Sequence, residues 1–466
     1  RRALLLAAVM EFAGAYLAGG EVAATVSKGI IDGRVFEPVP HLLLFGMIGA
    51  LLAAGIWLAI ASMRGWPVSA THAIVGAICG AGVAALGTGA VNWETMAEIV
   101  VSWLISPVLG AIVALLLTLS IRKLIFNTGN PIRQARRWGP MYAFLVGWIV
   151  ALVTITTGLK YVNISLGGVQ GQLLAIAIGI VLAIVAKALM GRIHLEESED
   201  RIFHFASVEK LFVPLMVFTG AAMAFAHGSN DLANGVGPMA TAIQIIETQA
   251  VSARSAVTPF MLLLGAIGIA VGVVTYGYKV MATIGSKITQ LTPTRGYAAT
   301  VAASIVVVAA SGIGMPVSTT HIAVGAVIGV GIARGIGALD MRVIGGIILS
   351  WIVTVPIAGI LAAVVRDVFM QGFPEELVMR GWLMQVLRDR PLVAVAVSTI
   401  IFGVLHYFSS GGQESAGERV LYLLNPTAFG FCAAAFVLLT RSSWPAVGIH
   451  AGMHLAHLAG ALMGVA

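Results

Sequence analysis

The residues best suited to chemistry are a carboxylate and two amides within one helical turn, Asn230, Asp231 and Asn234, in the segment 227–238. An aspartate inside a membrane span is costly and indicates a function. A carboxylate with two amide oxygens suits a hard monovalent cation such as sodium. The glycines on either side would let the backbone break and expose carbonyl groups. A surface turn is the alternative, but the residues that follow are apolar and favour the first interpretation.

A duplicated segment places hydroxyl groups and an imidazole in apolar surroundings. Residues 67–77 (PVSATHAIVGA) return as residues 316–326 (PVSTTHIAVGA), with eight of eleven positions identical at an offset of 249 residues. Downstream, Ser102-Trp103 and Pro107 return as Ser350-Trp351 and Pro356 at nearly the same offset. Such self-similarity indicates an internal repeat.

Each copy of this segment predicts an anion cradle. A proline fits the first turn of a helix, where its missing N–H costs nothing, and the free N–H groups of that turn attract anions without a fixed cation. The hydroxyl groups expected to help as donors are those of Ser69, Thr71, Ser318, Thr319 and Thr320. The alternative is that these hydroxyls bond to their own helix, and two matching copies argue against it. Glu11, alone in the uncharged stretch 3–18, predicts a coupling or gating role, with a neutral structural glutamate as the alternative.

The last hundred residues carry a second polar group. Glu375 and Glu376 are adjacent, and Arg380 follows at a spacing that allows pairing across a turn. His406 comes next along the chain, and then His450 and His454, which share one helix face. Carboxylates and histidines on apolar helices could hold and activate a water. The alternative is a set of charges at a membrane boundary, with the histidines bonded inside a bundle.

The elements that must position these residues are membrane-spanning helices. The chain has 466 residues, of which 59% are hydrophobic and 10% charged, and its mean hydropathy is +0.98. Soluble domains have about 25% charged residues. Continuous apolar runs recur, for example at 42–60, 99–119, 173–189 and 344–365, and a span needs about 20 such residues. Lipid allows only helices or closed barrels, and unbroken apolar runs favour helices.

Charge and cysteine content narrow the class further. The net charge of +7 reflects membrane topology rather than binding to nucleic acid, because basic residues cluster in loops. The basic stretch 121–138 contains no acid, and neither does the stretch from Lys279 to Arg295; we expect both to be cytoplasmic loops. The helix at 3–19 then runs outward and its counterpart at 259–278 runs inward, which predicts inverted repeats. Cys79 and Cys432 offer neither a disulfide framework nor metal-ligand spacing.

Residues 3–366 resemble the PiT family of inorganic phosphate transporters. The resemblance rests on the segment AHGSNDLAN, on both PVSxTH copies, and on Glu11-Phe12 followed by residues 28–32 (KGIID). It implies an all-α polytopic membrane protein, an inverted-repeat bundle with broken or re-entrant helices that carries phosphate with sodium or protons and needs no organic cofactor. By this resemblance the cation and phosphate site takes Asn230, Asp231 and Asn234, the five hydroxyl residues named above, and Glu11.

Three departures from the family pattern qualify the resemblance. The family has an Asn-Asp motif in each repeat, and we expect the first copy to precede Arg1, which we interpret as the start of a fragment. Ser229 stands where the family usually has Ala or Gly, and Ala70 replaces a threonine of the first hydroxyl segment.

The C-terminal group resembles the CPBP intramembrane proteases, relatives of CAAX-processing enzymes. The motifs EExxxR and FxxxH are present, and His454 stands where the family usually has Asn after His450. The resemblance implies that Glu375 or Glu376 activates water, assisted by His406 and His450, while metal binding stays undecided. No linker separates Val365 from Glu375, so the last transporter helix would also lead into this segment.

The sequence therefore predicts a first transporter repeat at 1–120, a basic loop with two linking helices at 121–208, a second repeat at 209–366 and a protease-like segment at 367–466. The predicted function is phosphate transport, with intramembrane proteolysis or transport of another oxyanion such as sulfate as alternatives. The expected partners are phosphate and the lipid bilayer, and a homodimer is left open. The expected location is a prokaryotic plasma membrane.

Overall fold

The computed structural model describes residues 2–20, 29–153, 155, 168–193, 206–252, 255–312, 317–407 and 416–463. Within these ranges the chain is helical, and its sole β contact is an isolated bridge between Ile31 and Val91. The principal helices are α1 (Arg2–Ala18), α3 (Pro40–Arg64), α4 (Ala70–Leu86), α5 (Trp93–Ile121), α6 (Pro131–Val153), α7 (Gly168–Arg192), α8 (Ala206–Thr248), α9 (Pro259–Gly272), α11 (Pro293–Gly312), α12 (Thr319–Arg334), α13 (Met341–Val364), α16 (Pro391–Tyr407), α17 (Ala416–Thr440) and α18 (Trp444–Met463).

Short helical pieces extend several of these helices. α5 continues through the π-helical turn η3 (Arg122–Phe126), and α9 continues through η7 (Val273–Gly277), α10 (Tyr278–Ala282) and η8 (Thr283–Lys287). α13 continues through η10 (Val365–Gly372), α14 (Phe373–Glu376), η11 (Leu377–Leu383) and α15 (Met384–Val386) as one helical run of 46 residues. The remaining short elements are η1 (Gly33–Phe36), η2 (Thr88–Ala90) and η9 (Ile336–Ala338).

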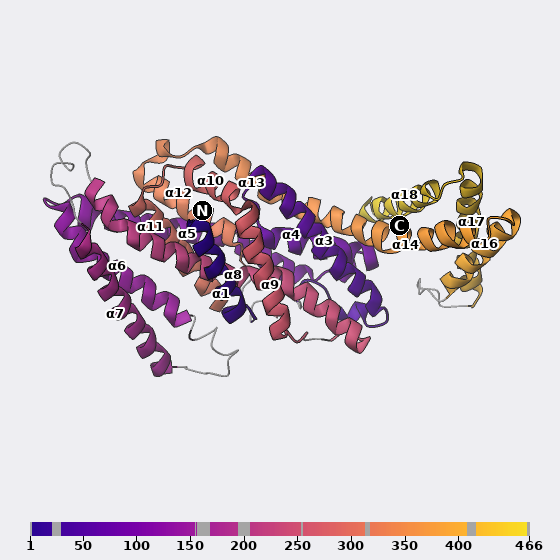
Figure 1. Ribbon diagram of the computed structural model, residues 1–466, viewed down its shortest axis with the longest axis horizontal. Coiled ribbons are helices and arrows are strands. Elements are labelled where there is room, and N and C mark those ends of the chain that lie inside the picture. The colour runs from indigo at the N-terminus through magenta and orange to yellow at the C-terminus, as the bar shows by residue number, and fades with distance from the viewer. Residues whose placement is uncertain are drawn as a thin grey trace.

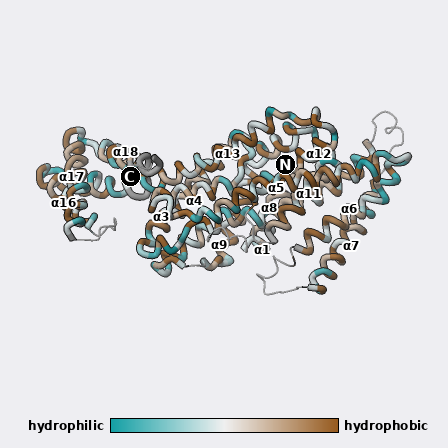
Figure 2. The backbone as a smooth tube through the Cα atoms, turned by 180° about the vertical axis from the view of Figure 1, so that it is seen from behind, coloured by the Kyte–Doolittle hydropathy of each residue, from teal (hydrophilic) through white to brown (hydrophobic). Residues whose placement is uncertain are grey.

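The molecule is elongated, with the α6–α7 hairpin at one end and the bundle of α16, α17 and α18 at the other (Figure 1). Among the described residues, eight helical runs are long and apolar enough to cross a membrane. Figure 2 shows hydrophobic residues along most of these helices and hydrophilic stretches near helix ends, as at the start of α6. Large apolar side chains such as Leu104, Ile184 and Ile352 are more than 60% exposed. The bilayer accounts for this exposure, because lipid solvates apolar side chains at no cost.

Helices α4 and α12 do not fit a simple spanning role. They contain 17 and 16 residues, about 24–26 Å at 1.5 Å per residue, which is short of the roughly 30 Å hydrocarbon core. Each packs mainly on a helix of the opposite repeat, α4 on α13 and α12 on α5. Gly80 and Gly325 allow these contacts, because a Cβ at either position would lie within 2.2 Å of a facing carbonyl oxygen. The short helix of each repeat therefore packs against a long helix of the other repeat.

The helix boundaries correct several expectations. The expected basic loop 121–138 is mostly helical: η3 and α6 leave only residues 127–130 between them. Charge does not end a helix, and Asn130 begins the next one by accepting a hydrogen bond from Arg133 N. The second expected loop is also short, because Lys279 lies inside the helical run that ends at Lys287. Its ammonium group donates to Met63 O at 2.9 Å, at the end of α3.

The chain passes from the transporter-like part to the C-terminal part without a break in helix. As expected from the missing linker, the last transporter helix also leads into the C-terminal segment. The division predicted at residue 366 thus falls inside a helix, at the buried ion pair of Arg366 with Asp367. Gly49 of α3 packs against Arg366, where a Cβ would lie 3.3 Å from the arginine Cβ. The junction is consequently packed against the first repeat.

Candidate functional site

The first candidate site lies where the two short helices begin. Ser69 caps α4 by accepting from His72 N at 3.2 Å, and Ser318 caps α12 by accepting from His321 N at 3.2 Å. The proline was expected in the first turn, but α4 begins at Ala70, so Pro67 lies outside the helix. The Pro67 carbonyl accepts a hydrogen bond from Trp351 Nε1 at 3.0 Å. Pro316 lies outside the described residues.

The helix beginnings are joined by hydrogen bonds that follow a two-fold pattern. Thr71 Oγ1 donates to Val317 O at 3.2 Å, and the equivalent Thr320 Oγ1 donates to Val68 O at 3.4 Å. Two threonines 249 positions apart thus bond to carbonyls that are also 249 positions apart. This reciprocity is what an internal pseudo-two-fold axis between the repeats requires.

The histidines of the two segments continue the pattern. His72 Nδ1 lies 3.1 Å from Trp351 O, and His321 Nδ1 lies 3.1 Å from Trp103 O. Each imidazole also packs on an indole, and the two imidazole centres are 4.4 Å apart. These histidines are at most 5% exposed and bond to helix carbonyls. They therefore hold the two repeats together rather than face a substrate.

The Asn-Asp motif lies beside these helix beginnings, on α8. Thr319 Oγ1 donates to the Asp231 carboxylate at 3.1 and 3.3 Å, and Asn230 Nδ2 donates to it at 3.1 Å. Asn230 Nδ2 also lies 3.3 Å from Val317 O. Asn234 Nδ2 lies 3.5 Å from Thr71 Oγ1. The carboxylate, amides, hydroxyls and carbonyls predicted from two distant segments thus form one connected cluster.

The expected break in the backbone at this motif is absent from α8. The helix runs without interruption from Ala206 to Thr248, through Gly228 and Gly235. Gly228 instead permits a close crossing, because a Cβ there would lie 2.1 Å from Glu11 O. Gly14 makes the matching contact from α1 with Phe225 O. The glycines serve helix packing, and the surface-turn alternative is wrong as well.

His227 joins Glu11 to the motif and was not among the predicted site residues. Its Nδ1 lies 3.3 Å from Glu11 Oε2, and its Nε2 lies 3.2 Å from Asp231 Oδ2. The two carboxylate side chains are each 11% exposed, while the imidazole is 32% exposed. A carboxylate–imidazole–carboxylate row thus connects α1 with α8. The signal was present in the sequence, because His227 precedes Asp231 by four residues and so shares its helix face.

This cluster lines a cavity of about 450 Å³. Its polar wall comes from α1, α8 and α12. The polar side chains of that wall are Glu11, His227, Asp231, Asn234 and Thr320. Its apolar wall comes from α3, α9 and η7. Ser69, Thr71, Ser318 and Thr319 do not line the cavity; they cap helices or bond behind it. No lysine or arginine is among the described lining residues.

The residues 28–32, part of the family resemblance, are described only from Gly29 onward. Asp32 there caps η1 by accepting from Arg34 N at 3.1 Å, and the Arg34 guanidinium donates to both carboxylate oxygens. The hydrogen bonds from Arg34 lower the pKa of Asp32. Asp32 therefore acts as a local cap and is not among the residues that line the cavity. Lys28 lies outside the described residues.

The second candidate site is in the C-terminal segment. Glu376 is fully buried, and its Oε1 accepts from Arg380 Nη1 at 3.0 Å and lies 2.8 Å from His450 Nδ1. The predicted pairing across a turn is confirmed. Arg380 also donates to Gly430 O at 3.1 Å and lies over the Phe402 ring.

Glu375, by contrast, points to an open space. Its side chain is 41% exposed, and Oε2 lies 3.8 Å from His450 Nε2. The His450 and His454 rings are stacked with centres 4.8 Å apart, as their shared helix face predicted. A cavity of about 370 Å³ is lined by Glu375 and by all three predicted histidines, His406, His450 and His454. Tyr422 and Asn425 of α17 line it too, and no motif had singled them out.

Comparison with known proteins agrees with both parts of the chain. The phosphate transporter family matches residues 1–362, and the type II CAAX prenyl endopeptidase Rce1-like family matches residues 356–456. A putative phosphate permease of Haemophilus influenzae is 43% identical over 78% of this chain and 87% of the relative. A putative phosphate permease of Pyrococcus horikoshii is 42% identical over 79% and 89%. The chloroplastic inorganic phosphate transporter 2-1 of Arabidopsis thaliana is 37% identical over 79% and 66%.

A solved structure described as the sodium-dependent phosphate transporter is similar as well. It superposes with a TM-score of 0.72 at 35% identity and covers 79% of this chain and 90% of that one. The chain is an integral membrane protein and belongs to the phosphate transporter family. Its bacterial and archaeal relatives fit a plasma membrane location.

Proposed function

We propose that this member of the phosphate transporter family carries inorganic phosphate together with sodium through the 450 Å³ cavity bounded by α1, α3, α4, α8 and α12. The observation that carries the proposal is the charge of the cavity wall. Glu11 and Asp231 bring two carboxylates, and the described lining residues bring no lysine or arginine. An anion that enters alone meets repulsion, which is strong where the effective dielectric is low. Even with a proton on the His227 imidazole between the two carboxylates, one negative charge is left over. A cation bound at the same time removes the remaining repulsion, so we expect phosphate and cation to enter together.

The oxygen atoms around Asp231 favour sodium as this cation. The Asp231 carboxylate, the Asn230 and Asn234 side-chain amides and the Val317 carbonyl lie in one connected cluster. Hard cations prefer such carboxylate, amide and carbonyl oxygens. The similar solved structure is named as sodium-dependent, which supports the same choice. A proton is the competing coupling ion, because the Glu11–His227–Asp231 row contains groups that can accept one.

Phosphate itself would bind on the other side of the cation, at the beginnings of α4 and α12. Asn234 presents an amide to the cavity, and the nearby helix N-termini favour negative charge. The Thr320 hydroxyl lines the cavity too and would turn from Val68 O, its acceptor at 3.4 Å, to donate to phosphate. Thr71, Thr319 and the two capping serines support this wall from behind. A site of neutral donors recognises a tetrahedral oxyanion by shape and charge, so sulfate is the competing substrate.

Uptake of radiolabelled phosphate into proteoliposomes tests the proposal. We expect uptake under an inward sodium gradient and none when choline replaces sodium, with or without a proton gradient. Excess sulfate should not lower phosphate uptake; if it does, the site does not distinguish the two oxyanions. Thr320→Val should raise the KM for phosphate, whereas Thr275→Val, which removes an exposed hydroxyl bonded to its own helix, should not. Uptake driven equally well by a proton gradient alone would contradict sodium coupling.

The C-terminal cavity favours a second candidate function, proteolysis within the membrane. Glu375 is exposed to that cavity and faces His450 Nε2, while the buried Glu376 fixes the same imidazole through Nδ1. In this arrangement Glu375 is the candidate base for water, and Glu376 with Arg380 positions His450. The match of residues 356–456 to the CAAX endopeptidase family supports the same assignment.

Cleavage of prenylated CAAX peptides by the full chain in detergent tests this second function. Glu375→Gln should abolish turnover, and Asp389→Asn, which changes an exposed acid of the same segment, should leave it intact. If the parent chain cleaves and Glu375→Gln cleaves at the same rate, Glu375 is not the base.

A further inference from the structure

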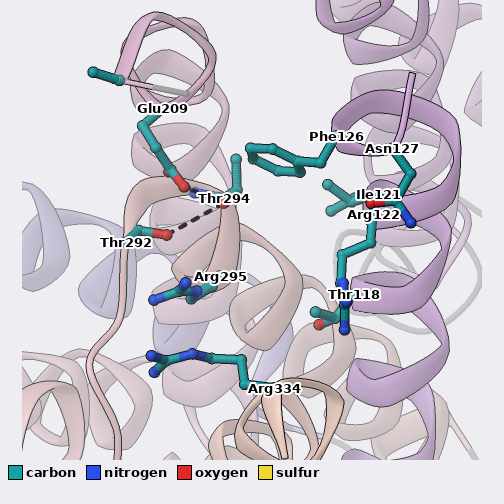
Figure 3. Close-up of a pocket in the computed structure, with 11 residues that line it drawn as sticks. Thr118, Ile121, Arg122, Phe126, Asn127, Glu209, Thr292, Thr294, Arg295 and Arg334 are labelled. Atoms are coloured by element: carbon teal, nitrogen blue, oxygen red, sulfur yellow. Dashed lines mark hydrogen bonds between the residues drawn. The ribbon is translucent and has the colours of Figure 1, made fainter. Parts of the chain in front are cut away.

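A third cavity, of about 680 Å³, lies apart from both candidate sites and shares no lining residue with them. It is bounded by the end of α5 with η3, the beginnings of α8 and α11, and the end of α12 (Figure 3). Two of these boundaries are the basic stretches expected to face the cytoplasm. The cavity therefore lies at the face of the basic loops, between helices of both repeats.

Three arginines dominate the charge of this cavity. Arg122, Arg295 and Arg334 all line it, and Figure 3 shows Arg295 and Arg334 extending from one wall while Arg122 descends from the opposite one. Glu209 is the single acid among the described lining residues. Its two oxygens accept from Thr294 N at 2.8 Å and Thr294 Oγ1 at 2.7 Å, so it already caps α11.

None of the three guanidinium groups forms an ion pair within the described part of the chain. Their partners are neutral: Arg122 Nη1 donates to Ala333 O at 2.6 Å, Arg334 Nη1 to Thr289 Oγ1 at 3.1 Å, and Arg295 Nη1 to Gln290 O at 3.3 Å. These bonds hold the side chains in place without neutralising them. A guanidinium has five N–H donors, so most of the donors stay available.

We propose that this cavity binds a phosphate group, supplied either by free inorganic phosphate or by the headgroup of an anionic phospholipid. Planar guanidinium groups match phosphate oxygens with two parallel hydrogen bonds. All three line one cavity, with Arg295 and Arg334 side by side and Arg122 across from them, and only one lining acid opposes them. Free inorganic phosphate, with a charge of about −1.5 to −2 near neutral pH, balances most of the excess, and a phosphodiester headgroup, with a charge of about −1, balances part of it. The bound group would bridge α5 of the first repeat to α11 and α12 of the second.

Three double substitutions separate this site from a general effect of positive charge. Arg122→Gln with Arg334→Gln removes two lining guanidinium groups. Lys123→Gln with Arg133→Gln removes two exposed charges from the same basic stretch, and neither residue lines the cavity. Arg122→Lys with Arg334→Lys keeps the charge but not the planar donor pair. All are measured as full chains at about 0.15 M ionic strength, which screens interactions between exposed charges more than about 8 Å apart; the lining and control pairs are both exposed.

The first arm measures equilibrium binding of radiolabelled inorganic phosphate in nanodiscs of phosphatidylcholine only, with choline in place of sodium so that the sodium-dependent cavity of the proposed function does not contribute. The second measures phosphatidylglycerol retained by the purified chain, by native mass spectrometry. We expect at least a tenfold loss in one arm for the lining pair, a partial loss for its lysine version and none for the control pair. The arm that changes identifies the source of the phosphate group. Thermal unfolding of each variant confirms that it is folded.

Three outcomes would overturn the proposal. Binding in both arms could be unchanged in the lining pair, or the control pair could lose as much. The third outcome concerns the sequence just before Ala206, which carries Glu196, Glu197, Glu199 and Asp200. If the parent chain binds no phosphate, but a variant with these four acids replaced by their amides does, then acids of the chain itself pair with the arginines and the proposal is wrong.

Discussion

Replacing Asp231 by asparagine tests the role of the carboxylate at nearly constant shape. The carboxylate accepts from Thr319 Oγ1 and Asn230 Nδ2 and lies 3.2 Å from His227 Nε2. An asparagine keeps one oxygen for the hydroxyl and amide donors, but it removes the charge. The substitution therefore separates cation binding from packing.

The expected loss follows from the charge. A monovalent cation about 4 Å from a carboxylate gains roughly 4 kcal/mol at an effective dielectric of 20, and about 1.4 kcal/mol corresponds to a factor of ten. The sodium concentration for half-maximal uptake should therefore rise by about 100- to 1000-fold in Asp231→Asn. The fold should persist, because a neutral hydrogen bond replaces a charged one at a cost of about 1–2 kcal/mol.

The assay is sodium-dependent phosphate uptake into proteoliposomes, with thermal unfolding of the purified chain measured alongside. Asp340→Asn is the matched control: Asp340 caps α13 through Arg342 N and Val343 N, and asparagine caps helices about as well. Sodium dependence unchanged in Asp231→Asn, or lost equally in Asp340→Asn, would refute the assignment of the cation to this carboxylate.

Three further substitutions test packing. Gly228→Ala should lower the free energy of unfolding by about 1–3 kcal/mol, because the added Cβ would lie 2.1 Å from a carbonyl oxygen of α1. Gly220→Ala is the control and should not lower it, because nothing lies within 4 Å of a Cβ there. Thermal unfolding in detergent measures both variants. Trp351→Phe leaves a buried carbonyl before α4 without its donor and should cost about 1–3 kcal/mol in the same measurement. Arg380→Met strips the buried Glu376 of its charged partner, so a loss of about 3–5 kcal/mol should expose the C-terminal segment to limited proteolysis.

The sequence was sufficient for the helical class, the internal repeat and the grouping of most site residues. A recurrence of eight identical residues in eleven positions is strong evidence because few sequences satisfy it by chance. Spacing along a helix likewise placed Arg380 beside Glu376, since it fixes which side chains share a face, whereas His450 was grouped with them by the resemblance to the intramembrane proteases.

Other features depend on contacts between distant segments and could not be predicted. A glycine beside Asp231 is compatible with a broken helix or with a close crossing, and only the position of α1 decides for the crossing. Ser69 and Ser318 were expected to face an anion, yet both cap their helices, because N-cap positions favour serine whatever lies beyond. The helix face that His227 shares with Asp231 could have been read from the sequence, but its contact with Glu11, 216 positions away, could not.

Thr71 and Thr320 each donate a hydrogen bond to a carbonyl of the opposite repeat. The site lies beside the pseudo-two-fold axis that these bonds follow, but the site itself is not symmetric. The hydroxyl-to-carbonyl bonds obey the symmetry, and so do the imidazole contacts behind them. Position 319 does not, because its counterpart in the first segment is Ala70. Of these two matched positions, Thr319 alone carries a hydroxyl, and it donates to Asp231. Placing a threonine at position 70 would test this asymmetry: Ala70→Thr should leave sodium dependence intact, whereas Thr319→Ala should weaken it by removing a donor that orients Asp231.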